Sequence, residues 1–164
     1  MKEKEKKLID IDDCAVKKLS RKSMSAYELS DYLLKRGYEK AEVGRVIDSM
    51  KDFGYLNDAR FACEYLIYDL ERGRSLKKAF FDLKQKGVSP EDVQAGYDEY
   101  VSEYGEPDER ASALREAEKV LLAADIQPGD DIPEKIQGRI ARRLFTRGFS
   151  QSMIYNILAE VRNR

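Results

Sequence analysis

The chain has 164 residues, a length that suits one domain or a short string of small modules rather than a large two-domain enzyme. Charged residues make up 37% and hydrophobic residues 42%, and the net charge is -1, so the chain is polar but able to fold and is no polycation. It contains no His, which removes the commonest general base and the commonest zinc ligand.

The two cysteines, Cys14 and Cys63, lie too far apart for a CxxC metal or redox motif. One disulfide is arithmetically possible, but we expect two reduced and mostly buried thiols. The charged N-terminus carries few apolar residues, and no apolar run approaches the roughly 20 residues of a membrane helix. We therefore expect a cytoplasmic protein without a signal peptide or membrane contact.

Helix signals dominate, and glycines or prolines stand between apolar segments with a 3.6-residue period. The first segment predicts a helix over about 12–21, which begins with Asp12 and Asp13. Ser25 and Glu28 then have the spacing of a capping box, so a second helix is expected to start there.

The middle of the chain repeats this order. Asn57 or Asp58 can cap a helix over about 58–71, and Ser75 can cap the next helix. Ser89 is followed by a proline and two acids, a strong start for a third helix.

The last part of the chain predicts a leading helix over about 108–124 and a final helix capped by Ser150. Pro128 and Gly129 mark a joint between them.

Three glycines mark one pattern that is used three times. Gly37, Gly87 and Gly148 each have Leu four residues earlier, Lys or Arg one residue earlier, and apolar residues one, six and ten positions later. With the helix before each unit, this predicts an all-α fold of three tandem three-helix modules. The expected divisions are a charged N-terminal tail over 1–11 and modules over 12–55, 56–104 and 105–164.

The near-zero net charge hides a segregation of charge. Residues 1–85 carry a net +3, residues 86–134 a net -10, and residues 135–164 a net +6. An acidic middle therefore separates more basic ends.

No motif points to an enzyme, because the chain has neither a Ser-His-Asp set nor a glycine-rich phosphate loop. The pairs Asp12–Asp13 and Asp130–Asp131 are possible Mg²⁺ ligands, but we favour helix starts and solvated acids. We expect no catalytic residues, no metal and no cofactor.

Two basic clusters are the candidates for a binding surface. Unbalanced charge of this kind favours phosphate or a partner's carboxylates, although a solvated helix face is the alternative. The first cluster comprises Arg72, Arg74, Lys77, Lys78, Lys84 and Lys86, and the second comprises Lys135, Arg139, Arg142, Arg143 and Arg147.

Most aromatic residues recur at helical spacings and are expected in the core. A stacking platform for single strands needs exposed rings interleaved with Arg or Lys. Phe80 and Phe81, beside Lys77 and Lys78, form the one stretch that suggests such a platform, and we favour a core role there too.

Several segments together resemble the RecX family, the bacterial regulators of the RecA recombinase. The likeness covers about residues 12–162 and rests on the order of its pieces. These are LLKRGY at 33–38, DFGYLNDARFA at 52–62, RGRSL at 72–76, LKQKGVS at 83–89 and LFTRGFS at 144–150.

The resemblance implies tandem three-helix modules in an elongated or curved array. It also implies a non-enzymatic protein that binds the RecA–single-stranded-DNA filament. It implies limits on filament growth, ATP hydrolysis and strand exchange, and thus a place in DNA recombination, DNA repair and the SOS response. Some members also bind DNA directly. The family's basic surface maps onto the two clusters above, whereas the acidic segment 86–134 matches no family motif and suits basic groups on the recombinase.

Two other functions are compatible with the sequence. One is a stand-alone DNA-binding helical protein, against which the net charge argues mildly. The other is a helical adaptor for a different protein. We expect a monomer in each case.

Overall fold

The computed structural model describes residues 9–163, and the regular structure in this range is helical throughout. This confirms the all-α prediction. The helices are α1 (Ile11–Leu19), α2 (Ala26–Lys35), α3 (Lys40–Asp52), α4 (Asp58–Glu71), α5 (Leu76–Gln85), α6 (Pro90–Tyr104), α7 (Glu109–Ala123), α8 (Glu134–Thr146) and α9 (Gln151–Arg162).

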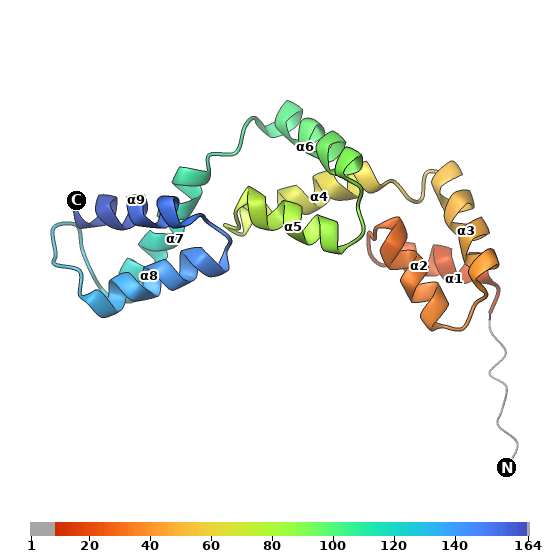
Figure 1. Ribbon diagram of the computed structural model, residues 1–164, viewed down its shortest axis with the longest axis horizontal. Coiled ribbons are helices and arrows are strands. Elements are labelled where there is room, and N and C mark those ends of the chain that lie inside the picture. The colour runs from red at the N-terminus through yellow and green to blue at the C-terminus, as the bar shows by residue number, and fades with distance from the viewer. Residues whose placement is uncertain (1–8, 164) are drawn as a thin grey trace, which may run out of the picture.

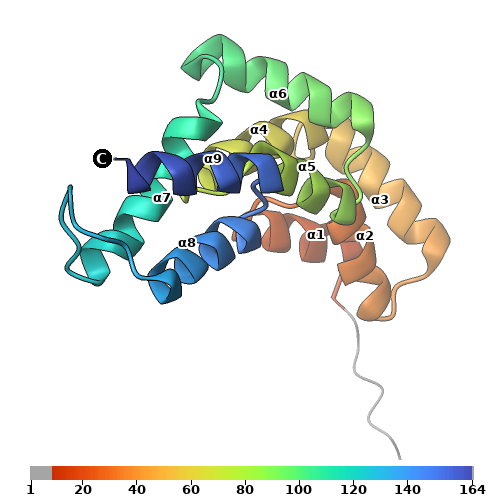
Figure 2. The same ribbon diagram turned by 60° about the vertical axis from the view of Figure 1, so that its left-hand side comes forward.

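The helices form three groups of three in an elongated, curved array (Figure 1). One end of the array is α1–α3, the middle is α4–α6 and the other end is α7–α9. In Figures 1 and 2, α4 lies between α6 on its upper side and α5 on its lower side. The predicted tandem three-helix architecture is therefore confirmed.

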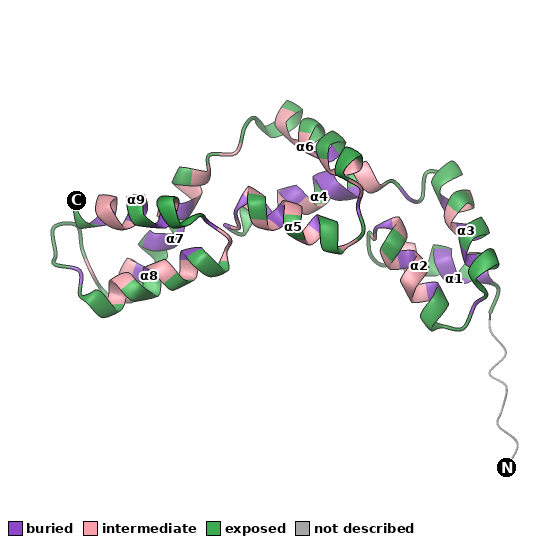
Figure 3. Cartoon of the chain, in the orientation of Figure 1, coloured by how far each residue is buried: buried purple, intermediate pink, exposed green. Residues whose placement is uncertain are grey.

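Each group of helices encloses its own hydrophobic cluster (Figure 3). The first cluster contains Leu29 and Leu33, the middle one Leu66 and Leu83, and the last one Ile140 and Leu144, all fully buried. These separate cores support the module divisions at 12–55, 56–104 and 105–164, which stay a prediction.

The three glycine turns share one backbone geometry. Gly37, Gly87 and Gly148 have φ values of 96°, 73° and 89°, a region that L side chains rarely adopt. After each glycine, the next backbone N–H donates to the carbonyl of the leucine five residues before it, at 3.1–3.4 Å. This Schellman-type closure reverses the chain and buries the leucine between the two helices of the turn.

The predicted serine caps are confirmed. Ser25 forms the capping box with Glu28, and Ser75, Ser89 and Ser150 each accept a hydrogen bond from a backbone N–H three residues later. Each such cap is worth about 1 kcal/mol.

Asn57 and Asp58, the two candidate caps of α4, make different contacts. Asn57 caps α4 through Oδ1, which accepts from the Arg60 N–H at 2.9 Å. The Asp58 carboxylate instead accepts from the Ala26 N–H of the preceding module at 2.8 Å.

The contact between modules uses corresponding residues at both junctions, although the donor atom of the serine differs. At the first junction, Ser25 Oγ donates to the Lys86 carbonyl at 2.5 Å, just before the Gly87 turn. At the second junction, the Ser75 N–H donates to the Arg147 carbonyl at 2.9 Å, just before the Gly148 turn. In each case the start of the second helix of one module docks on the glycine turn of the next.

An acidic residue completes each junction. Glu109 is the first residue of α7 and accepts from the Leu76 N–H at 2.7 Å, as Asp58 does from Ala26 at the first junction. A Cβ at Gly148 would lie 2.5 Å from the Lys78 Cβ, and a Cβ at Gly87 would overlap Tyr27. Glycine is therefore required at these turns by the close approach as well as by φ.

In the third module, the second helix does not begin with a corresponding serine. The serines of the first two junctions stand twelve residues before their glycine, whereas the corresponding residue in the third module is Ile136, inside α8. Here α8 begins earlier, at Glu134, with Pro133 as its N-cap residue and no side-chain cap.

Cys14 and Cys63 are free and buried, as expected, the first in the core of the first module and the second in α4. Within the described part of the chain, no helix combines the length and apolar character that a membrane span requires.

Candidate nucleic-acid interface

The candidate cations lie on or next to the second helices of the middle and last modules. The first basic cluster follows α5 and the two ends of that helix, and the second cluster follows α8. Both helices lie on the side of α4 that faces away from α6 in Figures 1 and 2. The cations of each cluster divide into two sets by their partners.

Two cations of the first cluster are paired with acids of their own module. Arg74 lies 3.2 Å from the carboxylate of the fully buried Asp69 and 3.7 Å from that of Asp82, and Lys78 lies 2.6 Å from Asp82. Burial raises the pKa of Asp69, and the nearby Arg74 guanidinium only partly opposes that rise. These two cations balance acids that are partly or wholly buried.

Lys86 belongs to the first junction. Its Nζ lies 2.7 Å from Glu28 Oε1 in the preceding module and 5.5 Å from the centroid of the Tyr65 ring. Both charged side chains are mostly buried, so the pair is less screened than a surface ion pair.

Two cations of the second cluster converge on Glu116 of α7, whose side chain is only 2% exposed. Its Oε2 lies 2.8 Å from Arg143 Nη2 and 2.7 Å from Arg147 Nε, and its Oε1 lies 2.5 Å from Lys119 Nζ. Arg147 also donates from Nη1 to the Arg72 carbonyl of the middle module at 2.7 Å. Glu116 therefore ties α8 to α7 and, through Arg147, ties the last module to the middle one.

The charge state of Glu116 follows from these contacts. Burial alone would raise its pKa, but hydrogen bonds from Lys119 and Arg143 and the charge of Arg147 lower it below its usual value. The carboxylate is thus held charged.

Six candidate cations have no acidic partner within residues 9–163. Among them Arg72 lies over the Tyr68 ring, 4.7 Å from its centroid. The other five are exposed: Lys77 and Lys84 on α5, and Lys135, Arg139 and Arg142 on α8.

Five of the six unpaired cations form rows along the surfaces of α5 and α8. With 3.6 residues per turn, Lys135, Arg139 and Arg142 fall within a sector of roughly 60°, and Lys77 and Lys84 within roughly 20°. We call these two groups the outer rows of α8 and α5. Rows of exposed, uncompensated cations fit the regular phosphates of a nucleic-acid backbone.

The two aromatic residues of α5 have different environments. Phe80 packs edge-on against Tyr97, with ring centroids 5.6 Å apart, as the core interpretation expects. Phe81 is 55% exposed and lies between Lys77 and Lys84 on the outer row, which the core interpretation did not expect.

The two acidic pairs, Asp12–Asp13 and Asp130–Asp131, have different positions in the fold. Asp12 and Asp13 lie in the first turn of α1, as expected, although the capping side chain is Asp10. Asp130 lies in the loop before α8 and accepts from the Gln127 N–H at 2.8 Å, so it is not a helix start. Within residues 9–163 no group of three or more acidic or Cys side chains is placed to hold a metal ion.

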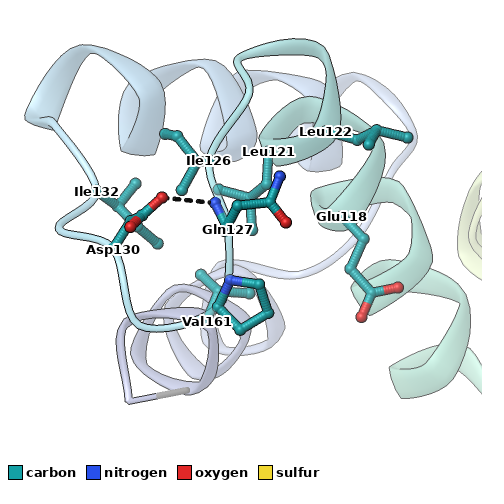
Figure 4. A pocket seen from close by; sticks show the side chains of 9 residues that line it. Glu118, Leu121, Leu122, Ile126, Gln127, Asp130, Ile132 and Val161 are labelled. Atoms are coloured by element: carbon teal, nitrogen blue, oxygen red, sulfur yellow. Dashed lines mark hydrogen bonds between the residues drawn. The ribbon is translucent and has the colours of Figure 1, made fainter.

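A separate groove lies in the last module between α7, the loop before α8 and the end of α9 (Figure 4). Leu121, Leu122 and Ile126 line it together with Glu118 and Asp130. Its apolar walls and acidic side chains do not suit phosphate.

Glu116 is the important residue that sequence reasoning missed. A signal was present, because Glu116 stands on the apolar stripe of α7 with Ala113, Ala117 and Val120. A charged residue on such a stripe needs a buried partner of opposite charge.

Comparison with known proteins finds relatives of this chain. The family described as "RecX, first three-helix domain" matches residues 13–50, which cover the first module. Regulatory protein RecX of Legionella pneumophila (strain Corby) is 28% identical over 152 residues, or 92% of this chain and 94% of the relative. Regulatory protein RecX of Clostridium botulinum (strain Eklund 17B / Type B) is 26% identical over 156 residues, or 95% and 70%.

A solved structure has the same fold. The crystal structure of RecX from Lactobacillus salivarius superposes with a TM-score of 0.69 over 92% of this chain and 94% of that chain, at 20% identity. The fold therefore defines a class: all-α proteins of tandem three-helix modules joined through glycine turns. Within that class, the chain belongs to the RecX family.

Proposed function

We propose that this protein is a non-enzymatic regulator that binds the filament of the RecA recombinase on single-stranded DNA and inhibits its ATP hydrolysis and strand exchange. Its membership of the RecX family supports the regulatory role. The observation that carries the proposal is the pair of outer rows on α5 and α8, whose cations have no acidic partner within residues 9–163.

The binding residues in this proposal are Arg72 and the five cations of the outer rows. Arg74, Lys78 and Arg143 pair with acids of their own modules. Lys86 and Arg147 pair with acids at the junctions between modules. These paired cations therefore support the surface and contribute little to phosphate binding directly.

The array suits a partner that is itself a repeating polymer. Two junctions of the same design fix three modules in one curved chain, so several modules can contact neighbouring repeats at once (Figure 1). Simultaneous contacts raise the effective concentration of each further contact. We propose that the protein acts in the cytoplasm as a monomer along such a filament.

The acidic helix α6 has a different role in this proposal. It lies on the side of α4 opposite α5, and its exposed acids include Glu91, Asp98, Glu99 and Glu103. These acids would repel DNA. We propose that α6 faces basic groups on the recombinase while the outer rows face the strand.

The test measures ATP hydrolysis by RecA assembled on single-stranded DNA at rising concentrations of the protein. We expect ATP hydrolysis to fall at ratios well below one regulator per recombinase subunit. The double variant Arg139→Ala/Arg142→Ala should weaken inhibition, and Lys51→Ala, which removes an exposed cation from α3 of the first module, should not.

Two results would replace the proposal. Unchanged hydrolysis with tight, salt-sensitive binding to naked DNA would identify a stand-alone DNA-binding protein. No effect in either assay would leave only the adaptor function.

A further inference from the structure

Two surface positions carry the same pair of side-chain types in both basic helices, α5 and α8. These positions lie six and three residues before the glycine turn. In α5 they hold Phe81 and Lys84, and in α8 they hold Arg142 and Phe145. All four side chains are exposed, Phe81 by 55% and Phe145 by 65%. Each module thus presents one ring and one cation, in opposite order.

The two rings have no evident role in the cores. Phe80 and Leu144, their neighbours in sequence, supply the core contacts. A phenylalanine that stays more than half exposed gains little of the free energy that burial provides. Lys78 Nζ lies 5.4 Å from the centroid of the Phe81 ring, so cations surround that ring.

The first module lacks the pair. The same two positions of α2 hold Asp31 and Leu34, and Asp31 forms an ion pair with Lys35 at 2.6 Å. At these two positions, the combination of ring and cation is therefore confined to the two modules that carry outer rows. This distribution ties the rings to the cations rather than to the fold, which all three modules share.

We propose that Phe81 and Phe145 are stacking platforms for unpaired bases of single-stranded DNA, whose phosphates contact Lys84 and Arg142. The inference rests on the proposed function and specifies how its surface meets the strand. Every base has a π face, so stacking on an aromatic ring tolerates any sequence, and flanking cations bind the phosphates on either side. A duplex offers the phosphates but keeps its bases stacked inside.

The test compares binding of the full chain to a fluorescently labelled oligo(dT) and to an abasic oligomer of the same length and charge, by anisotropy. Wild type should bind the abasic strand more weakly by on the order of five- to a hundredfold, the range of base–aromatic stacking. Phe81→Ala removes one of the two rings, so it should lose a smaller factor than this on oligo(dT) and almost nothing on the abasic strand.

Leu34→Ala is the matched control, because Leu34 is an exposed apolar residue at the position that corresponds to Phe145. It should leave both affinities unchanged. Equal binding of wild type to the two strands would overturn the inference, and so would an equal loss by Phe81→Ala on both.

Failure of this inference is separable from failure of the proposed function. Base-dependent binding to oligo(dT) without any effect on RecA ATP hydrolysis would keep the stacking platforms and reject the regulator. Inhibition of RecA with base-independent binding would keep the regulator and reject the platforms.

Discussion

Arg142 and Arg143 are neighbours in sequence on α8, yet their surroundings differ completely. Arg142 points into solvent without an acidic partner in residues 9–163, whereas Arg143 lies 2.8 Å from the buried Glu116 carboxylate. Lys77 and Lys78 on α5 differ in the same way, because only Lys78 pairs with Asp82. Each basic cluster therefore contains two kinds of cation. Some pair with acids of the same chain, and the others have no acidic partner in residues 9–163 and remain available for phosphate.

The largest effect on stability is expected for the buried leucine that α5 and α8 carry at corresponding positions. Leu83 is fully buried at the position that corresponds to Leu144 in α8. Leu83→Ala should lower the free energy of unfolding by about 2–5 kcal/mol, because it leaves a cavity in the core of the middle module. Urea unfolding measures this, and a loss below about 1 kcal/mol would mean that the equivalence of the two helices is wrong.

The paired cations should matter for stability through Glu116. Glu116→Gln should destabilise the protein by about 1–3 kcal/mol, because Arg143 and Arg147 lose a charged partner in a buried setting. The control Glu99→Gln changes an exposed acid of α6 and should have almost no effect in the same unfolding experiment. Equal effects of the two variants would contradict the structural role of Glu116.

The pH dependence sharpens this point. The folded-state pKa of Glu116 lies below its ordinary value of 4.5, so its stabilisation is full above pH 4.5 and is lost as the pH falls through the folded-state pKa. The stability difference between wild type and Glu116→Gln should therefore shrink on acidification below pH 4.5. A difference that stays constant down to pH 3 would show that the carboxylate charge is not what stabilises the junction.

The smallest effect on stability is expected on the outer row. Arg139→Ala/Arg142→Ala should change the free energy of unfolding by no more than about 0.5 kcal/mol, since both side chains are exposed and lack acidic partners in residues 9–163. Thermal unfolding by circular dichroism checks this. A clear drop in Tm would place these arginines among the structural cations.

Local signals made much of the fold predictable. Ser25, Ser75 and Ser150 cap helices because a hydroxyl can accept from a backbone N–H three residues later, a contact that depends only on nearby sequence. Gly37 and the other turn glycines were predictable for the same reason, since φ above zero is a local requirement.

Local sequence does not predict which cations of the two basic clusters are paired with acids of the same chain. Whether Arg143 is free depends on Glu116, 27 residues earlier and on another helix. Whether Lys86 is free depends on Glu28, 58 residues earlier in another module. Composition and helical period place a cation on a face, but only the packing of modules decides which acids reach it.

The central claim is that the outer rows, not the paired cations, contact the strand. Its most direct test is the salt dependence of binding to labelled oligo(dT) by wild type and by Arg142→Ala. Loss of one phosphate contact should lower the slope of log K against log salt concentration by about 0.7. A slope unchanged by Arg142→Ala, together with a slope lowered by Arg143→Ala, would contradict the account.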